Sequence, residues 1–288
     1  MRFTGLDHLL QAGAGHLKTG PLALIFVEDE IELASTLRHH LSLGFGTVVA
    51  LMPQAFALPD DPGAEVVRVD CDTTSEGALA TALNRVIRGV PTGTWIYYGW
   101  NAEYLFYPFC EDRGVGEMLA FHTEERRQAM LAYVIDLYAE DLGATPNAVS
   151  RETAHLDRSG YYALARKDAQ GLSQERQLDF YGGLRWRFEE HIPTDRRRID
   201  RISIFQTQPG LITQGDYRFN IEEYNTYACP WHHNITAAIC SFRTAKALKL
   251  NPGSTFDIDT FKWHNSMPFE WSSRQLLDLG LIEPGQWF

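Results

Sequence analysis

The chain has 288 residues, of which 44% are hydrophobic and 22% are charged, a composition typical of globular proteins. Its 26 basic and 37 acidic residues give a formal net charge of −11, which argues against a protein that binds nucleic acids through their phosphates. Its four cysteines include no Cys-x-x-Cys pair, which argues against a zinc ribbon or a secreted disulfide scaffold.

The N-terminal segment, from Met1 to Gly20, has no apolar stretch long enough for a signal peptide. Elsewhere the apolar runs, such as Pro21 to Val27, fall far short of the ~20 residues that a membrane helix needs. We therefore expect a cytoplasmic protein without a transmembrane segment.

Residues 22–98 predict alternating strands and helices. Strands are expected at residues 22–27, 47–52, 66–69 and 95–98, and helices at residues 31–43 and 77–88. This alternation predicts an α/β fold with a central, mostly parallel sheet flanked by helices. In such sheets ligands bind at the carboxyl ends of the strands. Those ends carry acidic residues here, at Glu28, Glu30, Asp70 and Asp72.

The later elements are predicted from helical spacing and from turn residues. A long helix is expected at Thr123–Leu142, where Thr123 serves as the N-cap and Gly143 follows the last turn. Little regular structure is expected at residues 144–177, a strand at 202–206, a helix at 235–250 and a short helix at 272–279. The aromatic tail that ends in Trp287 and Phe288 is expected to dock onto the body of the protein or onto a neighbouring subunit. No linker divides the chain, so we expect a single domain.

Four segments match the motifs of one family in their order and spacing. Glu28-Asp-Glu30 opens a helix that ends in His40-Leu-Ser-Leu-Gly44-Phe45, where the family has an "NE" pair and then "H-h-x-x-G-F". The stretch from Trp95 to Leu105 occupies the place of "W-h-h-h-h-D-x-D-E-F-h". Gly182-Gly183-Leu-Arg185-Trp-Arg187 matches "G-G-h-R-x-R", and His232-His233 lies near the place of a late "H-F-K". Across these segments the chain resembles the family 2-type bacterial glycosyltransferases of the GT-A fold.

This resemblance implies a GT-A-like domain with a nucleotide-binding half at residues 20–110 and an acceptor half with the C-terminal tail at residues 111–288. It implies transfer of a sugar from a nucleotide-sugar donor to a glycan or other hydroxyl acceptor. The residues that it places around the donor are Glu28, Glu30, Asp70, Asp72, Trp100, Gly182, Gly183 and Arg185. Glu103 and the glycine pair are expected to face the same cleft as the strand ends.

The acidic triplet that the family uses to bind a metal ion is changed in this chain. Trp100 and Ala102 stand where the family has two aspartates, and only Glu103 remains. Mg²⁺ and Mn²⁺ prefer carboxylate oxygens, and the bound ion neutralises the departing diphosphate. The resemblance therefore implies Mn²⁺ or Mg²⁺ with Glu103 and His232 as candidate ligands, whereas the replaced aspartates favour a metal-independent reaction.

Two catalytic carboxylates are predicted, Glu103 and Asp179. An inverting transferase needs a base to take the proton of the acceptor hydroxyl, and Asp179 stands three residues before the glycine pair. Arg185 and Arg187 alternate as on a strand and would share one face, from which arginine could stabilise the diphosphate. Each feature also has a structural interpretation, in which Glu103 caps backbone amides and the aspartates at strand ends form turns.

Three functions are consistent with these residues. The first is an active glycosyltransferase, and the second is a degenerate transferase that binds a sugar nucleotide or a glycan without turnover. The third is a metal-dependent hydrolase or phosphotransferase that uses Asp70 and Asp72. The sequence leaves open the donor sugar, the acceptor, the stereochemical outcome and the oligomeric state.

Overall fold

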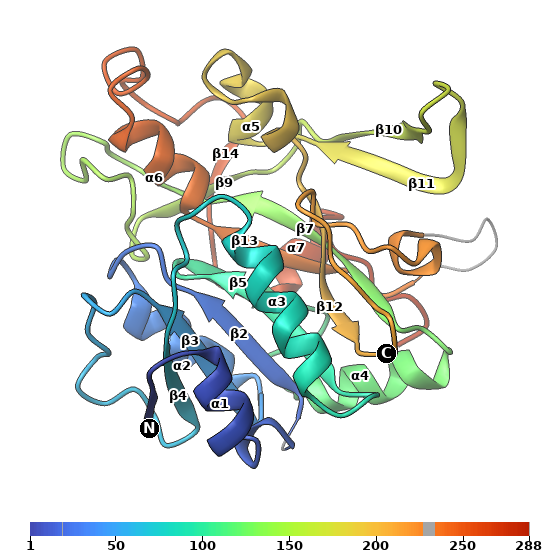
Figure 1. The fold of residues 1–288 in the computed structure, drawn as a ribbon. Helices are drawn as coiled ribbons and strands as arrows, with labels where there is room; N and C mark the ends of the chain where they lie inside the picture. Colours follow the sequence, from blue (N-terminus) through green and yellow to red (C-terminus); the bar gives the residue numbers. More distant parts are fainter. Residues whose placement is uncertain (19, 227–233, 288) are drawn as a thin grey trace. The chain divides into compact units, whose positions relative to one another are not determined.

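Strands rich in Val, Ile, Leu and Ala form the sheets of the computed structural model, which describes residues 1–18, 20–226 and 234–287 (Figure 1). The chain divides into two units. The first unit contains Met1–Tyr104, Cys110–Leu131 and Ile202–Thr226, and the second contains Leu105–Phe109, Ala132–Arg201 and the described part of Tyr227–Phe288. Both combine strands with helices, so the predicted α/β class is confirmed.

The sheet of the first unit is mainly parallel, as the alternating pattern predicts. Its strands are β1 (Arg2–Phe3), β2 (Leu22–Phe26), β3 (Thr47–Met52), β4 (Val66–Asp70), β5 (Trp95–Trp100) and β12 (Asp200–Gln206), in the order β1-β4-β3-β2-β5-β12. The pairs from β1 to β5 are parallel, and β12 runs antiparallel to β5, so the sheet is mixed. Every residue of β2 and β3 is buried, because helices cover both faces of these strands.

The helices of the first unit form where apolar residues recur at helical spacing. They are α1 (Leu6–Ala12), α2 (Leu33–Ser42), α3 (Ala78–Gly89) and α4 (Val115–Glu124), with short 3₁₀ helices at His16–Lys18 and Glu222–Asn225. The predicted helices at 31–43 and 77–88 are confirmed as α2 and α3. α1 and α3 lie on the same face of the sheet (Figure 1), where Gly89 of α3 leaves room for Leu10 of α1. A Cβ atom at residue 89 would lie 2.3 Å from Leu10 Cδ2.

The second unit is built from short strands and helices. It contains the parallel pair of β7 (Ala129–Asp136) and β13 (Ala237–Ser241), the antiparallel sheet of β8 (Tyr138–Ala139), β9 (Ala154–Asp157) and β14 (Ser266–Pro268), and the hairpin of β10 (Tyr162–Lys167) and β11 (Ser173–Tyr181). Its helices are α5 (Leu184–Arg187), α6 (Arg243–Leu250) and α7 (Ser273–Asp278), with 3₁₀ turns at Glu189–His191 and Thr194–Arg196. The chain passes from the first unit to the second within β6 (Glu103–Phe106).

One predicted helix is wrong over most of its length and another over its first half, for the same reason, while the second half of the latter is confirmed as α6. The helix expected at Thr123–Leu142 is replaced by the end of α4, then β7 and β8, and the first half of the helix expected at 235–250 is β13. β7 and β13 pair with each other, with Ala237 opposite Ala132 and Ser241 opposite Asp136. Nearly all of their residues are buried, and a strand covered on both faces has the same continuous apolar sequence as a buried helix.

The segment at 144–177 also differs from the prediction of little regular structure. It contains β9 and most of the β10–β11 hairpin, in which Tyr162 lies opposite Tyr181 and Lys167 opposite Ser173. The turn is held by the Asp168 carboxylate, which accepts hydrogen bonds from the amides of Gln170 and Leu172. Polar residues on an exposed hairpin resemble a loop in sequence, because the strands need no apolar face.

The C-terminal tail docks within the second unit, as its aromatic residues predict. Trp287 is only 7% exposed, and its ring lies 6.4 Å from that of Tyr107 and 6.0 Å from that of Phe109. Phe288 is outside the described residues. Replacing Trp287 by alanine should lower the free energy of unfolding by about 3–5 kcal/mol, because it opens a cavity under two aromatic rings.

Urea unfolding followed by circular dichroism checks this expectation. Phe256→Ala is the matched control, since Phe256 is an aromatic residue of the same unit that is 87% exposed. A Trp287→Ala midpoint equal to that of the control would show that the tail contributes nothing to stability.

Candidate functional site

The carboxyl ends of the parallel strands in the first unit lie along one edge of the sheet. The order in which the chain adds these strands reverses between β2 and β5. From β2 the chain moves outward to β3 and β4, and it then returns to place β5 on the other side of β2. Phe26 at the end of β2 lies opposite both Leu51 of β3 and Trp100 of β5. In open α/β sheets, ligands bind outside the strand ends at such a reversal. This edge between β2 and β5 is the candidate site, and we call it the switch-point edge.

Asn101 organises the switch-point edge, although the sequence motifs did not single it out. Its side chain is fully buried, and its Oδ1 accepts a hydrogen bond of 2.9 Å from the Glu28 amide. Its Nδ2 donates to Asp29 Oδ1 at 2.8 Å and to the carbonyl of Ile31 at 2.9 Å. The amide therefore ties the loop after β2 to the end of β5. The signal in the sequence is a lone amide side chain at the end of an apolar strand.

Glu103 faces the interior at the start of β6. It is fully buried, and its Oε2 accepts a hydrogen bond of 3.0 Å from the Trp100 amide. Ala102, between them, has a left-handed φ of 59°, and its amide donates to Thr36 Oγ1 at 2.9 Å. The carboxylate thus caps the backbone of a tight turn, which is the structural interpretation given above. Its catalytic and metal-binding roles stay predictions.

Trp100 lies at the end of β5 with only 5% of its surface exposed. Its ring centroid lies 6.0 Å from those of Phe26 and Tyr217, the latter at an interplanar angle of 88°. Tyr217 is a bulky residue at a φ of 66°, which is a strained conformation for such a side chain. The pair forms an aromatic wall within the first unit, near the place where a donor is expected.

The aspartates after β4 are engaged by neighbouring groups. Asp70 accepts from Arg2 Nη2 at 2.7 Å and from Arg68 Nε at 3.0 Å, and the Arg2 hydrogen bond in particular lowers the pKa of the Asp70 carboxyl. Asp72 accepts from the amides of Thr74 and Ser75, at 2.9 and 3.1 Å, which lowers the pKa of Asp72. Both carboxylates thus stabilise local structure.

The remaining predicted acids of this edge lie on the loop after β2. Glu30 is exposed, and its Oε1 accepts a hydrogen bond of 3.0 Å from the Ala57 amide. Glu28 is half-buried and is anchored through its backbone to Asn101. The structure therefore brings Glu28, Trp100 and Glu103 together at the two strands that flank the reversal.

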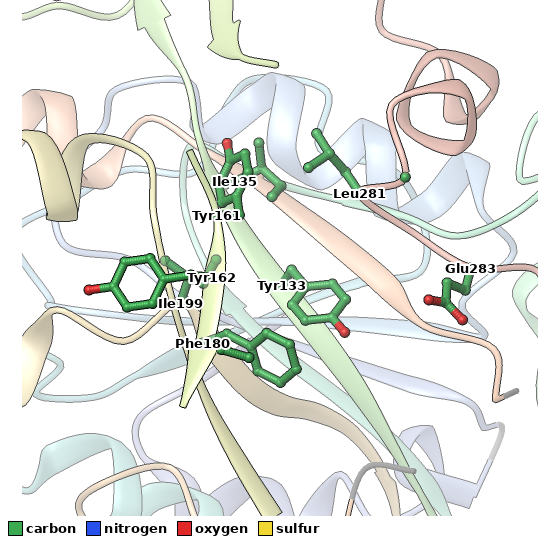
Figure 2. Close-up of a pocket in the computed structure, with 10 residues that line it drawn as sticks. Tyr133, Ile135, Tyr161, Tyr162, Phe180, Ile199, Leu281 and Glu283 are labelled. Atoms are coloured by element: carbon green, nitrogen blue, oxygen red, sulfur yellow. The ribbon is translucent and has the colours of Figure 1, made fainter. Parts of the chain in front are cut away.

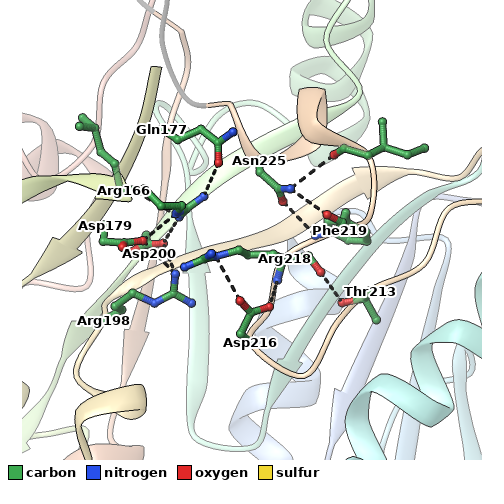
Figure 3. Close-up of polar contacts among 12 residues, drawn as sticks. Arg166, Gln177, Asp179, Arg198, Asp200, Thr213, Asp216, Arg218, Phe219 and Asn225 are labelled. Carbon is green, nitrogen blue, oxygen red and sulfur yellow. Dashed lines mark hydrogen bonds and ion pairs between the residues drawn. The ribbon is translucent and has the colours of Figure 1, made fainter. Parts of the chain in front are cut away.

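Asp179, the predicted base, belongs to a network of ion pairs in the second unit (Figure 3). It accepts from Arg166 Nε at 2.8 Å and from Arg198 Nη1 at 2.9 Å, and Arg166 also reaches Asp200 Oδ2 at 3.3 Å. Burial alone would raise the pKa of Asp179, but the two guanidinium groups outweigh it and lower the pKa. Burial raises the pKa of Asp200 despite its arginine neighbours. A carboxylate held in this way is a weaker base than an isolated one.

The glycine pair permits close packing. A Cβ atom at Gly182 would lie 2.2 Å from the ring of Tyr161, and one at Gly183 would lie 3.0 Å from Asp136 Oδ2. Gly183 has a left-handed φ of 61° and opens α5. The expectation that Arg185 and Arg187 alternate on one strand face is therefore wrong, because the glycine conformation starts a helical turn.

The two arginines of α5 point to different partners. Arg185 donates to the carbonyl of Arg198 at 2.7 Å and to Thr244 Oγ1 at 3.2 Å, and its Nε lies 3.5 Å from Asp136 Oδ1. Arg187 donates to Asp157 Oδ2 at 2.8 Å. Each guanidinium is engaged within the second unit, so the contact of Arg185 with a diphosphate stays a prediction.

A buried acidic pair in the second unit was missed by the sequence motifs. Asp157 is 1% exposed and accepts from Tyr138 Oη at 2.5 Å, Trp263 Nε1 at 2.8 Å and Arg187 Nε at 2.8 Å. Asp136 ends β7 and is equally buried, and this burial raises the pKa of Asp136 although Arg185 opposes the shift. For Asp136 the signal was a single acid within an apolar run, which the wrong helix prediction concealed, whereas Asp157 lies in the segment where little regular structure was expected.

His232, the second candidate ligand, lies outside the described residues. Among the residues that the structure describes, no group of three or more His, Cys, Asp and Glu side chains is arranged to hold a metal ion. None of the described helices combines the length and apolar character that a bilayer span requires.

No protein-family model matches the chain, and no curated protein matches it. Among solved structures, the chain is similar to HddC from Yersinia pseudotuberculosis, at 8% sequence identity and a TM-score of 0.31. The match covers 76% of this chain and 90% of that protein. A likeness at this level carries no argument about function.

Proposed function

We propose that the chain is a GT-A-type glycosyltransferase that binds a nucleotide-sugar donor at the switch-point edge and transfers the sugar to a glycan or other hydroxyl acceptor. The observation that supports this most is the reversal of strand order between β2 and β5, because such reversals are where open α/β sheets bind ligands. Trp100, with Tyr217 against it, offers an aromatic wall beside that edge.

We further propose that transfer does not depend on Mn²⁺ or Mg²⁺ held at the end of β5. Asn101 uses its amide to bind the loop after β2, and Glu103 uses its carboxylate to cap the Trp100 amide. Neither Trp100 nor Ala102 offers an oxygen ligand in its side chain. The positive charge that stabilises the leaving diphosphate would then come from side chains.

A degenerate protein that binds a sugar nucleotide without turnover is the second candidate. It is favoured by the same replacement of two metal-binding aspartates by Trp100 and Ala102. The ion pairs of Asp179 also favour this candidate, because the carboxylate would have to leave two arginines before it accepts a proton. The hydrolase that would use Asp70 and Asp72 receives no support, because both carboxylates are held by neighbouring groups.

Thermal unfolding with a panel of nucleoside diphosphates tests the donor site. At least one nucleotide should raise the melting temperature by several degrees, because a ligand at about 100 times its dissociation constant adds about 2.7 kcal/mol. The shift should persist in EDTA, and Glu30→Ala should reduce it, because the proposed site places the exposed Glu30 carboxylate against the donor. Glu175→Ala, an exposed acid of the β11 strand, is the matched control.

Release of the nucleoside diphosphate from the stabilising sugar nucleotide then separates the two candidates. Turnover in EDTA supports the transferase, and binding without turnover supports the degenerate protein. If no nucleotide shifts the melting temperature, both the transferase and the degenerate binding protein are contradicted.

A further inference from the structure

The second unit contains an open pocket of about 290 Å³ that the predicted donor site does not use (Figure 2). Tyr133 and Ile135 line it from one face of β7, since they stand two residues apart on that strand. The β10–β11 hairpin contributes Ala163 and Phe180, and the C-terminal segment contributes Leu281. We call this feature the aromatic pocket.

The hairpin leaves the aromatic pocket open because a small residue of β10 faces a large one of β11. Ala163 lies opposite Phe180 in the register, so both side chains are on the face of the hairpin that lines the pocket. Tyr162 and Leu164 alternate with Ala163 and lie on the other face, and Figure 2 shows the Tyr162 ring directed away from the pocket. The methyl group of Ala163 therefore leaves space beside the Phe180 ring that a larger side chain would fill.

The rings of the aromatic pocket are held in place by contacts of their own. Tyr133 and Phe180 pack edge to face, with centroids 4.9 Å apart. Tyr161 donates its hydroxyl to the carbonyl of Asp157 at 2.9 Å, so its ring, and not its hydroxyl, lines the pocket. That ring packs on Gly182, where a Cβ atom would lie 2.2 Å from it. The aromatic surface is therefore preformed.

The Tyr133 hydroxyl is the polar group that this surface offers to a ligand. Within the described part of the chain, Tyr133 Oη has no hydrogen-bond partner. Burial raises the pKa of Tyr133, so the hydroxyl stays neutral and can both donate and accept a hydrogen bond. Glu283 also borders the pocket, but this residue is exposed, so its carboxylate remains in contact with solvent.

This lining suits an apolar ring with a single hydroxyl group. Binding pockets of this kind combine aromatic and aliphatic walls with a few polar groups that orient the ligand. A cavity of about 150 Å³ is enough for benzene, so the aromatic pocket has room for a substituted ring. An ionised group on the ligand would lose its hydration against the apolar walls, which is costly without a partner of opposite charge.

We propose that the aromatic pocket binds an uncharged aromatic ring that carries a hydroxyl group, a ligand of the phenol class. The ring packs against the side chains of Phe180 and Tyr161, and its hydroxyl exchanges a hydrogen bond with Tyr133 Oη. The site belongs to the second unit alone, so it goes beyond the proposed donor site and does not depend on it.

Saturation-transfer NMR on the intact chain, without nucleotide, tests this. The probes, at millimolar concentration, are para-cresol, toluene, which lacks the hydroxyl, and para-toluate, which has a carboxylate in its place. Para-cresol and toluene should bind, and para-toluate should not. Ala163→Phe should abolish binding of both, because the new ring fills the space beside Phe180, and it should fold, because Ala163 is exposed. Leu164→Phe, which adds the same ring on the other face of the hairpin, should bind both as the wild type does.

Tyr133→Phe separates the hydrogen bond from the shape of the pocket. It should weaken the binding of para-cresol about 5-fold and leave that of toluene unchanged, since only para-cresol uses Tyr133 Oη.

The inference is overturned if para-cresol does not bind, if Ala163→Phe binds it as Leu164→Phe does, or if Tyr133→Phe affects para-cresol and toluene equally. Binding of para-toluate as tight as that of para-cresol would also overturn it. The nucleotide panel is a separate measurement on a site in the first unit, so either proposal can fail while the other stands.

Discussion

Replacing Asp157 by alanine should lower the free energy of unfolding by about 3–5 kcal/mol, the cost of removing one partner of a buried ion pair. The change leaves the Arg187 guanidinium, which is 10% exposed, without its carboxylate. It also removes the acceptor of the Tyr138 hydroxyl and of the Trp263 indole N–H. Urea unfolding at neutral pH measures the effect.

A double-mutant cycle identifies the source of that loss. Arg187→Ala should also destabilise, and the double variant should cost less than the sum of the single changes, since neither charge is then left alone. Glu175→Ala, which removes an exposed carboxylate of the same unit, should stay within about 0.5 kcal/mol of the wild type. An Asp157→Ala protein as stable as this control would contradict the assignment of Asp157 as a structural anchor.

Replacing His40 by phenylalanine should make the protein less sensitive to acid. Burial lowers the pKa of His40 from 6.5 to about 3. The unfolded chain therefore binds a proton that the folded chain does not over this range, and stability falls as the pH drops from about 6.5 to 3. The linked free energy amounts to about 5 kcal/mol. The phenylalanine ring should be tolerated, because the His40 ring already stacks on Tyr97 at 4.8 Å and packs near Phe45.

Urea midpoints at several values between pH 4 and pH 7.5 check the His40 prediction. The variant should lose less stability than the wild type as the pH falls, whereas the exposed control His8→Gln should follow the wild type. Some acid sensitivity should persist in the variant, since burial also lowers the pKa of His122 to about 4. Parallel pH profiles of the wild type and His40→Phe would refute the linkage.

The sequence predicts the first unit well and the second poorly. The strands at 22–27 and 47–52 were recognised because helical segments separate them, so the alternation itself defines the fold class. β7 and β13 were taken for helices because their buried sequences carry no period, and only their pairing with each other makes them strands. That pairing joins residues about a hundred positions apart, which no local pattern contains.

At the candidate site, too, the sequence identifies residues by their local position but does not identify their distant partners. The acids at the strand ends were found, because they follow apolar runs directly. That Asp70 would bind Arg2 could not be predicted, since the partner is 68 positions away. Asn101 and Asp157 were missed because each acts through several long-range hydrogen bonds and belongs to no local motif.

The left-handed turn at Ala102 bears on how easily this edge could gain or lose a cation. An alanine pays a steric cost at a φ of 59°, whereas aspartate and asparagine are the non-glycine residues that adopt this region most readily. Aspartate at position 102 would therefore suit the backbone, but its carboxylate would be buried, because Ala102 has no exposed surface. The main chain at position 102 therefore adopts a conformation that aspartate or asparagine accepts more readily than the alanine that stands there.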